Sequence, residues 1–454
     1  MGSSSFPRYA VFILLAVFFL FLFWLDFQEP YLRWDENAYL SNARSYIKDS
    51  PYTEDFRFPL LSFVLGNIWR LTGESLFVAK LLVILLCTGS VYLFYLISRY
   101  FFTGIQPFVA TILFAFSPLT VDWGNKVYTD FPGLFFVLLS FLIFLRWKTV
   151  PGFLLVGVSA GLAFLSRFTY GLWFASLGLL FLWKLFSDKR RVKVLVDGLS
   201  VFLGFSLVLL PWLIVNQLRH RSMFWNVVQQ FNIVDQYHYS STVLDGLLGL
   251  LSGFNALIIL AIIAIPVISY LKKEEFLLPS IFFTFFTLYF LFFVRMKLDR
   301  FWIGLLPFVI ILALFTVDRY LSSWQRPVSY LLLTLMIASS FLVVDGILAV
   351  RDCRSDGSLV RSLDFVGKNT ASGDVIVSNF WPYFGYSDNL ASRGMSGKPV
   401  DSFRIRDHAK YVIYHDGIGE PYDRSALDSW DKAVRVAEFS DRCDGTAYVY
   451  GISY

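Results

Sequence analysis

The chain has 454 residues, of which 56% are hydrophobic and 19% aromatic, while only 16% are charged. This composition, with a mean hydropathy of +0.60, excludes an ordinary soluble protein and predicts a chain that crosses the membrane several times. The net charge of +5 does not indicate a nucleic-acid partner. Cations cluster in short loops such as residues 187–193, where anchoring at the cytoplasmic face explains them.

The first apolar run, residues 9–25, is expected to remain as a signal anchor. It is long for a signal-peptide core, and no small-residue cleavage pattern follows it. A helix needs about 20 apolar residues to cross about 30 Å of hydrocarbon, so the sequence predicts about eleven spans. Two runs, 106–119 and 153–165, are short for this purpose. The further runs are residues 76–102, 106–119, 131–147, 153–165, 171–185, 194–215, 243–271, 276–294, 301–317 and 328–350.

The stretch WDENAY, residues 34–39, follows the first run and carries Asp35 and Glu36. Apolar residues recur after Asp35 at helical spacing, with polar residues between them, which predicts a helix in the plane of the membrane interface. A second amphipathic segment at residues 59–69 would complete a shelf at the membrane surface. Asp35 stands at the helix start, where a carboxylate can cap backbone N–H groups; capping and chemistry are both open roles. The apolar positions are Tyr39, Leu40, Ala43, Tyr46 and Ile47.

Asp130 is a second acid at a membrane edge. Because Phe131 and Pro132 follow it at the start of a predicted span, it suits a helix N-cap as well as a substrate contact, and the two roles are compatible. The bias of Lys and Arg among loops favours an N-terminus on the inside. The outer loops then still contain cations that anchoring does not explain, among them Arg57, Arg295, Lys297 and Arg300.

The composition changes at residue 351. Beyond it, the short runs DVIVSN, KYVIYH and AYVYGI predict strands, and a helix is expected near residues 358–368. We therefore expect an α-helical polytopic membrane domain over residues 1–350 and a small soluble α/β domain over residues 351–454. With an odd number of spans, this tail lies on the same outer side as Asp35. Cys353 and Cys443 bracket it as a candidate disulfide in an oxidising compartment, with two unpaired thiols as the alternative.

Four stretches resemble a known family. WDENAY resembles the D-E-x-x-Y element after the first span in the protein O-mannosyltransferase and aminoarabinose transferase group of GT-C membrane glycosyltransferases. Residues 57–81 (RFPLLSFVLGNIWRLTGESLFVAKL) resemble that group's K-P-P-L stretch, with Arg57 and Phe58 in place of its lysine and first proline. YTDFPG, residues 128–133, resembles the second acidic motif. KLDRFWIGLLPF, residues 297–308, resembles the late R-Y-x-x-P-x-x-P element, whose proline pair is reduced to Pro307.

The resemblance implies a GT-C fold and transfer of a sugar from a polyprenyl-phosphate carrier to an acceptor hydroxyl. Such a reaction needs a base for the acceptor proton and cations for the departing phosphate. Asp35 is the expected base, because its carboxylate is ionised at neutral pH. Glu36 points about 100° away on a helix, so we expect it to bind or orient rather than to share the proton. Asp130 is the second acid expected at the site.

Guanidinium groups suit the departing phosphate because they bind such an anion through two hydrogen bonds. Snorkelling of the same side chains to the interface is the alternative. Tyr39 and Trp34 suit stacking on a sugar face, but aromatic belts place the same residue types at membrane edges. The candidates for the phosphate are Arg57, which matches the family lysine, Arg300, Lys297, Arg295 and Arg167.

The expected partners are a dolichyl- or undecaprenyl-phosphate-linked sugar donor, the lipid bilayer, and an acceptor hydroxyl on a protein, lipid or surface glycan. No cofactor is certain: the histidines and cysteines show no metal-ligand spacing, while Mg²⁺ or Mn²⁺ bridging Asp35, Asp130 and phosphate stays open. A transporter, or a non-catalytic receptor or scaffold, is the alternative class. A transporter is expected to carry internal repeats and ionisable residues at mid-membrane, whereas the acids here gather at the outer edge.

Overall fold

The computed structural model describes residues 8–29, 32–236, 241–271, 276–320, 325–354, 357–371, 373–388, 390–395, 398–418, 422–441 and 445–453. Contacts within the chain divide it into two compact units. The membrane unit comprises residues 1–23, 56–60 and 81–344, and the sheet unit comprises residues 24–55, 61–80 and 345–454. The sheet unit thus contains the first polar loop together with the tail. The domain boundary at residue 350, inferred from the change in composition, stays a prediction.

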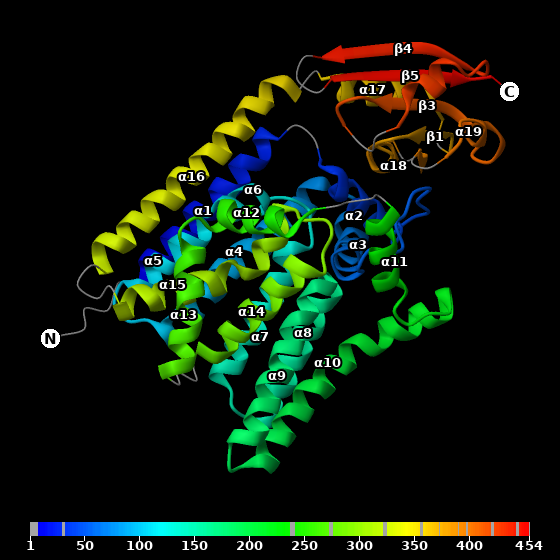
Figure 1. The fold of residues 1–454 in the computed structure, drawn as a ribbon. Coiled ribbons are helices and arrows are strands. Elements are labelled where there is room, and N and C mark those ends of the chain that lie inside the picture. Colours follow the sequence, from blue (N-terminus) through cyan, green and yellow to red (C-terminus); the bar gives the residue numbers. More distant parts are fainter. Residues whose placement is uncertain are drawn as a thin grey trace. The chain divides into compact units, whose positions relative to one another are not determined.

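All described secondary-structure elements of the membrane unit are helices (Figure 1). Helices α1, α4 and α16 continue into the sheet unit. Among the described residues, six helices are long and apolar enough to cross a membrane, or seven if one bent pair counts as a single span. Other runs form apolar helices of 10–17 residues, so the expected number of spans stays a prediction. The elements are α1 (Arg8–Gln28), α4 (Leu76–Phe101), α5 (Gln106–Ala115), α6 (Pro118–Trp123), α7 (Asp130–Arg146), α8 (Val150–Ser166), η1 (Phe168–Tyr170), α9 (Gly171–Ser187), α10 (Arg191–His220), α11 (Trp225–Gln236), α12 (Val243–Phe254), α13 (Leu257–Leu271), α14 (Leu277–Phe292), η3 (Asp299–Leu305), α15 (Leu306–Tyr320) and α16 (Gln325–Arg354).

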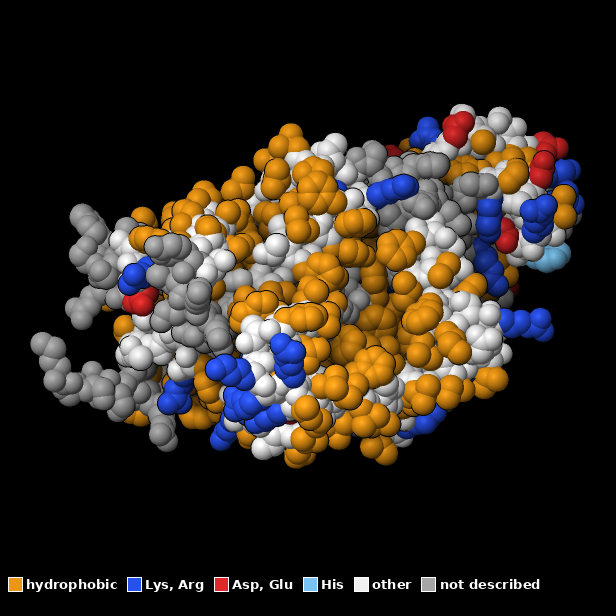
Figure 2. Space-filling model, turned by 60° about the horizontal axis from the view of Figure 1, so that its bottom comes forward, with side chains coloured by type: hydrophobic (Ala, Val, Ile, Leu, Met, Phe, Trp, Pro, Cys, Tyr) orange, Lys and Arg blue, Asp and Glu red, His pale blue; other side chains and the backbone are white. Residues whose placement is uncertain are grey.

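Exposed apolar side chains dominate the surface of these helices, as expected for a chain that crosses a membrane repeatedly. Figure 2 shows hydrophobic side chains over most of one face, with Lys and Arg gathered in separate places. Large residues such as Phe186, Leu203 and Phe341 are more than half exposed. In water such a surface would drive aggregation, whereas lipid tails cover it without penalty. The multi-pass membrane prediction is therefore confirmed.

Two apolar runs are broken where a single helix was expected. Residues 243–271 form α12 and α13, which meet at an angle of 103°, and Asn255 at the break has a positive φ of 51°. Residues 106–119 end in a turn before α6, where the Ser117 hydroxyl accepts a hydrogen bond from the Thr120 N–H at 3.1 Å and Pro118 opens the new helix. Hydropathy alone does not detect these breaks, because apolar residues continue through both.

The sheet unit combines two N-terminal helices with an α/β layer. Its five-stranded sheet has the order β2-β1-β3-β5-β4; β1 is parallel to β2 and β3, and β5 is antiparallel to β3 and β4. The expected strands in DVIVSN, KYVIYH and AYVYGI are confirmed as β1, β3 and β5. The elements are α2 (Trp34–Arg44), α3 (Leu60–Thr72), α17 (Ser358–Asn369), β1 (Val375–Ser378), α18 (Pro382–Ser387), β2 (Ala391–Gly394), α19 (Asp401–Ile405), β3 (Ala409–His415), α20 (Arg424–Asp428), β4 (Ala433–Asp441) and β5 (Gly445–Ile452).

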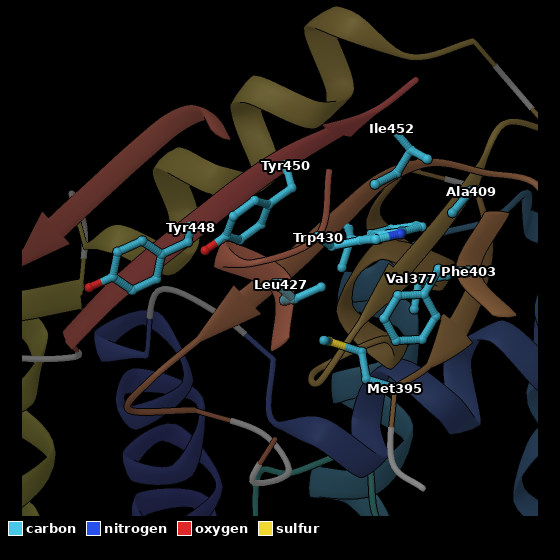
Figure 3. Packing of buried hydrophobic residues seen from close by; sticks show 10 residues of the cluster. Val377, Met395, Phe403, Ala409, Leu427, Trp430, Tyr448, Tyr450 and Ile452 are labelled. Carbon is cyan, nitrogen blue, oxygen red and sulfur yellow. The ribbon is translucent and has the colours of Figure 1, made fainter. Parts of the chain in front are cut away.

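Both faces of this sheet are buried, which explains why its central strands are apolar at nearly every position. On one face Val377 packs with Met395, Phe403 and Trp430, as Figure 3 shows. On the other, Ile376 and its neighbours pack with α17 and α18. Alternate residues of a strand point to opposite faces, so one short run supplies both cores.

The helix predicted after Asp35 exists as α2, but its polar side is buried rather than solvated; its place in the membrane interface stays a prediction. Asn37, Ser41 and Arg44 are buried as fully as the apolar residues of the helix. Ser41 donates to the carbonyl of Tyr52 at 2.7 Å. A solvent-exposed face of the helix was inferred from polar residues at helical spacing. In the structure these side chains form hydrogen bonds with other side chains and with the backbone inside the sheet unit.

Candidate active site

Asp130 is the first residue of α7 and forms an ion pair with Arg167, which follows α8. Tyr170 donates its hydroxyl hydrogen to the backbone carbonyl of Asp130 at 2.7 Å. The other carboxylate oxygen of Asp130, Oδ2, is buried and has no hydrogen-bond partner among the residues that the structure describes. The N-cap position belongs to Thr129, so the interpretation of Asp130 as the cap is wrong.

Glycine makes this arrangement possible. A Cβ at Gly133, in the first turn of α7, would overlap the ring of Tyr170. A Cβ at Gly304 in η3 would lie 2.9 Å from the opposite edge of the same ring. The Tyr170 ring therefore fits between two glycines, and this fixes the hydroxyl that holds the start of α7 beside Arg167.

Arg300 lies among aromatic rings close to this ion pair. Its guanidinium carbon is 4.5 Å from the centre of the Tyr128 ring and 5.5 Å from that of Phe301. The guanidinium carbon of Arg167 lies 4.6 Å from the centre of the same Phe301 ring. One aromatic ring, that of Phe301, thus makes cation–π contacts with both guanidinium groups. The predicted candidates Asp130, Arg167 and Arg300 are brought together here.

Lys126 is a buried cation that the sequence reasoning missed. It has no measurable exposure, and its ammonium donates to the side-chain oxygen of Asn125 at 3.0 Å. Lys126 precedes Asp130 by four residues in the loop between α6 and α7. The sequence could have indicated this residue, because Lys126 lies between two apolar runs and close to Asp130, the acid of the family motif.

Arg57 and Lys297 are used differently from Arg300. The carbonyl of Arg57 accepts from the Asn226 side chain at 3.2 Å, and its guanidinium lies 5.4 Å from the Phe56 ring centre. Lys297 donates to the carbonyls of Val294 at 2.8 Å and Ser241 at 3.1 Å. Burial lowers the pKa of Lys297, and Asp245 opposes that shift. These contacts fix the loop that leads into η3 and Arg300.

Asp35 occupies the second position of α2 and is partly exposed, whereas the cap is Arg33. The capping hydrogen bond comes from Glu36, whose Oε2 accepts from the Arg33 N–H at 2.8 Å. The interpretation of Asp35 as the N-cap is therefore wrong, because Glu36 performs that task from one turn inside the helix. Asp35 keeps the place in the first turn where the helix dipole stabilises a carboxylate.

A lysine missed by the sequence analysis holds Glu36. Lys80 of α4 donates to Glu36 Oε1 at 2.8 Å and lies 3.0 Å from Asp26 of α1. The Glu36 side chain is fully buried and Lys80 nearly so. One ammonium thus joins the ends of three helices, α1, α2 and α4. Glu36 was expected either to bind substrate or to orient the site, and its contacts favour the orienting role. Lys80 stands where the family motif has its F-A-A-R-L arginine.

The far end of α2 is also fixed by charge. Arg44 and Lys48 both bind Glu74, at 2.7 and 2.8 Å. Burial tends to raise the pKa of Glu74, but the hydrogen bonds from Arg44 and Lys48 outweigh it and leave that pKa below its ordinary value. Between the two ends, Tyr39 is buried, and its carbonyl accepts from the Ser62 hydroxyl at 2.9 Å. The helix that carries Asp35 is therefore anchored along its whole length.

The remaining expectations concern cysteines and metals. The side chain of Cys353 and the whole of Cys443 lie outside the described residues, so their disulfide stays a prediction; Cys87 is a buried free thiol. No three His, Cys, Asp or Glu side chains within the described ranges are placed to hold a metal ion.

The predicted site residues are divided between the two units. The sheet unit carries Asp35, Glu36 and Tyr39, and the membrane unit carries Asp130, Arg57, Lys297 and Arg300. Their convergence at one site stays a prediction.

Comparison with known proteins agrees with these features. Residues 51–215 match the family described as dolichyl-phosphate-mannose-protein mannosyltransferase, which confirms the resemblance predicted from the motifs. No curated protein matches the chain. The match begins near the K-P-P-L-like stretch and includes Asp130 and Arg167.

The fold is that of the GT-C membrane glycosyltransferases. ArnT from Cupriavidus metallidurans bound to undecaprenyl phosphate has a TM-score of 0.71 at 13% identity, with 98% of this chain and 99% of that chain covered. The oligosaccharyltransferase AglB from Archaeoglobus fulgidus, in complex with an inhibitory peptide and a dolichol-phosphate, gives 0.59 at 12% identity over 91% and 70%. The mycobacterial arabinofuranosyltransferase AftD gives 0.53 at 12% identity, over all of this chain and 40% of that one.

Proposed function

We propose that this chain is an integral membrane glycosyltransferase that moves a sugar from a polyprenyl-phosphate donor to an acceptor hydroxyl on a protein, lipid or surface glycan. The observation that carries the proposal is the shared fold with ArnT over almost the full length of both chains. That relative binds undecaprenyl phosphate. The match of residues 51–215 to the mannosyltransferase family supports the same reaction class.

The proposed step is a single displacement. The carboxylate of Asp35 accepts the proton of the acceptor hydroxyl as its oxygen bonds to the anomeric carbon of the sugar. The bond from that carbon to the phosphate oxygen breaks, and the electron pair leaves with the polyprenyl phosphate, whose negative charge rises by one. Because attack and departure occur on opposite sides, the anomeric configuration inverts. Positioned base catalysis of this kind contributes about 10² to 10⁴ in rate.

The cations are assigned to the departing phosphate. Arg300 is assigned first, because its guanidinium lies beside the Tyr128 and Phe301 rings and a guanidinium suits a phosphate. Arg57 is assigned with it through the family motif. Lys297 donates to two carbonyls, so we assign it to holding the loop before Arg300. Asp130 is assigned to the sugar through its buried Oδ2, with Arg167 fixing its orientation.

A metal ion is not needed for these assignments. Asp130 Oδ2 is a ligand type that Mg²⁺ or Mn²⁺ accepts, but the described residues supply no group of three ligands. Turnover with EDTA, compared with turnover after added Mg²⁺ or Mn²⁺, tests whether a metal ion takes part. The proposal places the reaction and the sheet on the extracytoplasmic side, where polyprenyl-linked donors serve surface acceptors.

The test is incubation of the purified protein in lipid nanodiscs with a panel of polyprenyl-phosphate sugars and candidate acceptors. Mass analysis then follows the released polyprenyl phosphate and the glycosylated acceptor. We expect one donor to be consumed, with equal amounts of carrier phosphate and product. Donor that crosses a proteoliposome membrane unchanged would contradict the proposal in favour of transport.

A further inference from the structure

Helix α18 of the tail packs directly on α2. The indole of Trp34 meets the Trp381 ring edge-to-face, with centroids 4.8 Å apart and planes at 81°. It meets the Tyr383 ring in the same way at 6.3 Å. Trp34 also packs against the buried cluster beneath the sheet, which includes Phe380 and Phe384. The first residue of α2 is thus part of the hydrophobic core of the tail.

The contact continues to the other end of α2. The guanidinium of Arg44 lies 4.4 Å from the centre of the Tyr386 ring. Between these ends, a Cβ at Gly385 would overlap the ring of Tyr52, and the Tyr52 carbonyl accepts from Ser41 of α2. Only a glycine in α18 lets the two segments approach so closely.

These contacts fix the rotation of α2 about its own axis. Trp34 and Asp35 are adjacent, so their side chains leave the helix about 100° apart. The face that contains Trp34, Ser41 and Arg44 is held by α18 and the Tyr52 loop. Glu36, on another side, is held by Lys80. Because two sides of the helix are fixed, the direction of Asp35 is fixed as well.

We propose that α18 together with its N-cap residue Trp381 is a positioning element for Asp35, with Trp381 as the main residue. The proposal rests on the proposed function, since it assigns a role to the tail in the same reaction. Trp381 touches neither donor nor acceptor: it acts through Trp34 on the orientation of α2. A shift of about 1 Å in a reacting group can cost about 100-fold in rate, so a loose α2 slows turnover without weakening donor binding.

The experiment compares Trp381→Ala with Trp430→Ala, each in the full-length protein. Trp430 is a matched control, because it lies in the core on the opposite face of the same sheet. We expect Trp381→Ala to lower kcat about 10- to 100-fold with the donor KM within about twofold of wild type. Trp430→Ala, measured where it is folded, should retain kcat. Trp381→Phe, which keeps an aromatic edge for Trp34, should restore most turnover.

Hydrogen exchange supplies a readout that does not depend on activity. In Trp381→Ala the amides of α2 should exchange faster, while those of β3 keep their protection; Trp430→Ala should show the reverse. Equal loss of kcat in both alanine variants, a change confined to KM, or unchanged exchange in α2 would overturn the positioning role. If the wild type consumes no donor, the proposed function fails, and the exchange data still decide whether α18 holds α2.

Discussion

The two acids assigned to the reaction are held in opposite ways. In the membrane unit, Asp130 receives a guanidinium directly from Arg167, so the charge of the acid itself is paired. In the sheet unit, the ammonium of Lys80 forms an ion pair with Glu36, which follows Asp35 in the sequence. The ion pair between Glu36 and Lys80 fixes helix α2. The comparison thus separates an acid that is held by its own ion pair from an acid whose helix is fixed through the neighbouring residue.

Lys80→Met should produce the largest loss of stability. Lys80 lies near two carboxylates, those of Glu36 and Asp26, and removing one partner from a buried ion pair costs about 3–5 kcal/mol. We expect a loss of about 4 kcal/mol, measured by unfolding in mixed micelles. Lys48→Met is the control, because that exposed lysine also binds a glutamate but should contribute only about 0–1 kcal/mol. Equal losses would contradict the role of Lys80.

Arg167→Met should cost somewhat less, about 3 kcal/mol, since it leaves Asp130 buried with its partner removed. The double variant Asp130→Asn/Arg167→Met should recover part of this loss, because no charge then remains at the pair. A double variant no more stable than Arg167→Met would show that the two side chains are not coupled. The same unfolding measurement serves for all three proteins.

Gly133→Ala should destabilise the membrane unit by about 1–3 kcal/mol through overpacking against Tyr170. It should also slow turnover, since Tyr170 holds the start of α7. Gly178→Ala in α9 is the matched control, because a Cβ there meets nothing within 4 Å. The control is expected to be neutral or slightly stabilising, as alanine favours helix. A comparable loss at both positions would contradict the fit of the Tyr170 ring.

Replacement of Asp388 is expected to have the smallest effect, a change in how the stability of the folded protein depends on pH. Burial, with help from Asp364, raises the pKa of Asp388 to about 6. The folded state then binds more protons than the unfolded state between about pH 4 and pH 6, so stability falls as pH rises through this window. Asp388→Asn should remove about 1–2 kcal/mol of that decline. Identical pH profiles of unfolding for variant and wild type would argue against the shift.

The sequence predicted what local patterns determine. Short strand-like runs marked β1, β3 and β5, and apolar residues at helical spacing marked α2. The strands β2 and β4 were missed: β4 has an exposed, charged side typical of a sheet edge, and β2 has only four residues. The bend at Asn255 was missed because apolar composition continues through it.

At the candidate site, residue types were easier to predict than partners. Asp35, Asp130 and Arg300 came from motifs, but no spacing rule pairs Asp130 with Arg167 or Glu36 with Lys80. Those pairs join helices distant in sequence, and only tertiary packing decides which cation meets which acid. The error on capping has a local cause: the helices begin one or two residues earlier than expected, so the cap positions fall on Arg33 and Thr129 rather than on Asp35 and Asp130.

The central claim is that Asp35 accepts the acceptor proton, and turnover of Asp35→Asn tests it most directly. The control is Asp49→Asn, an exposed acid in the same loop. Both variants are compared with wild type on the consumed donor, after unfolding measurements show that each is folded. We predict that Asp35→Asn loses about 10² to 10⁴ in kcat and that Asp49→Asn keeps wild-type turnover. A folded Asp35→Asn protein with wild-type turnover would contradict the account.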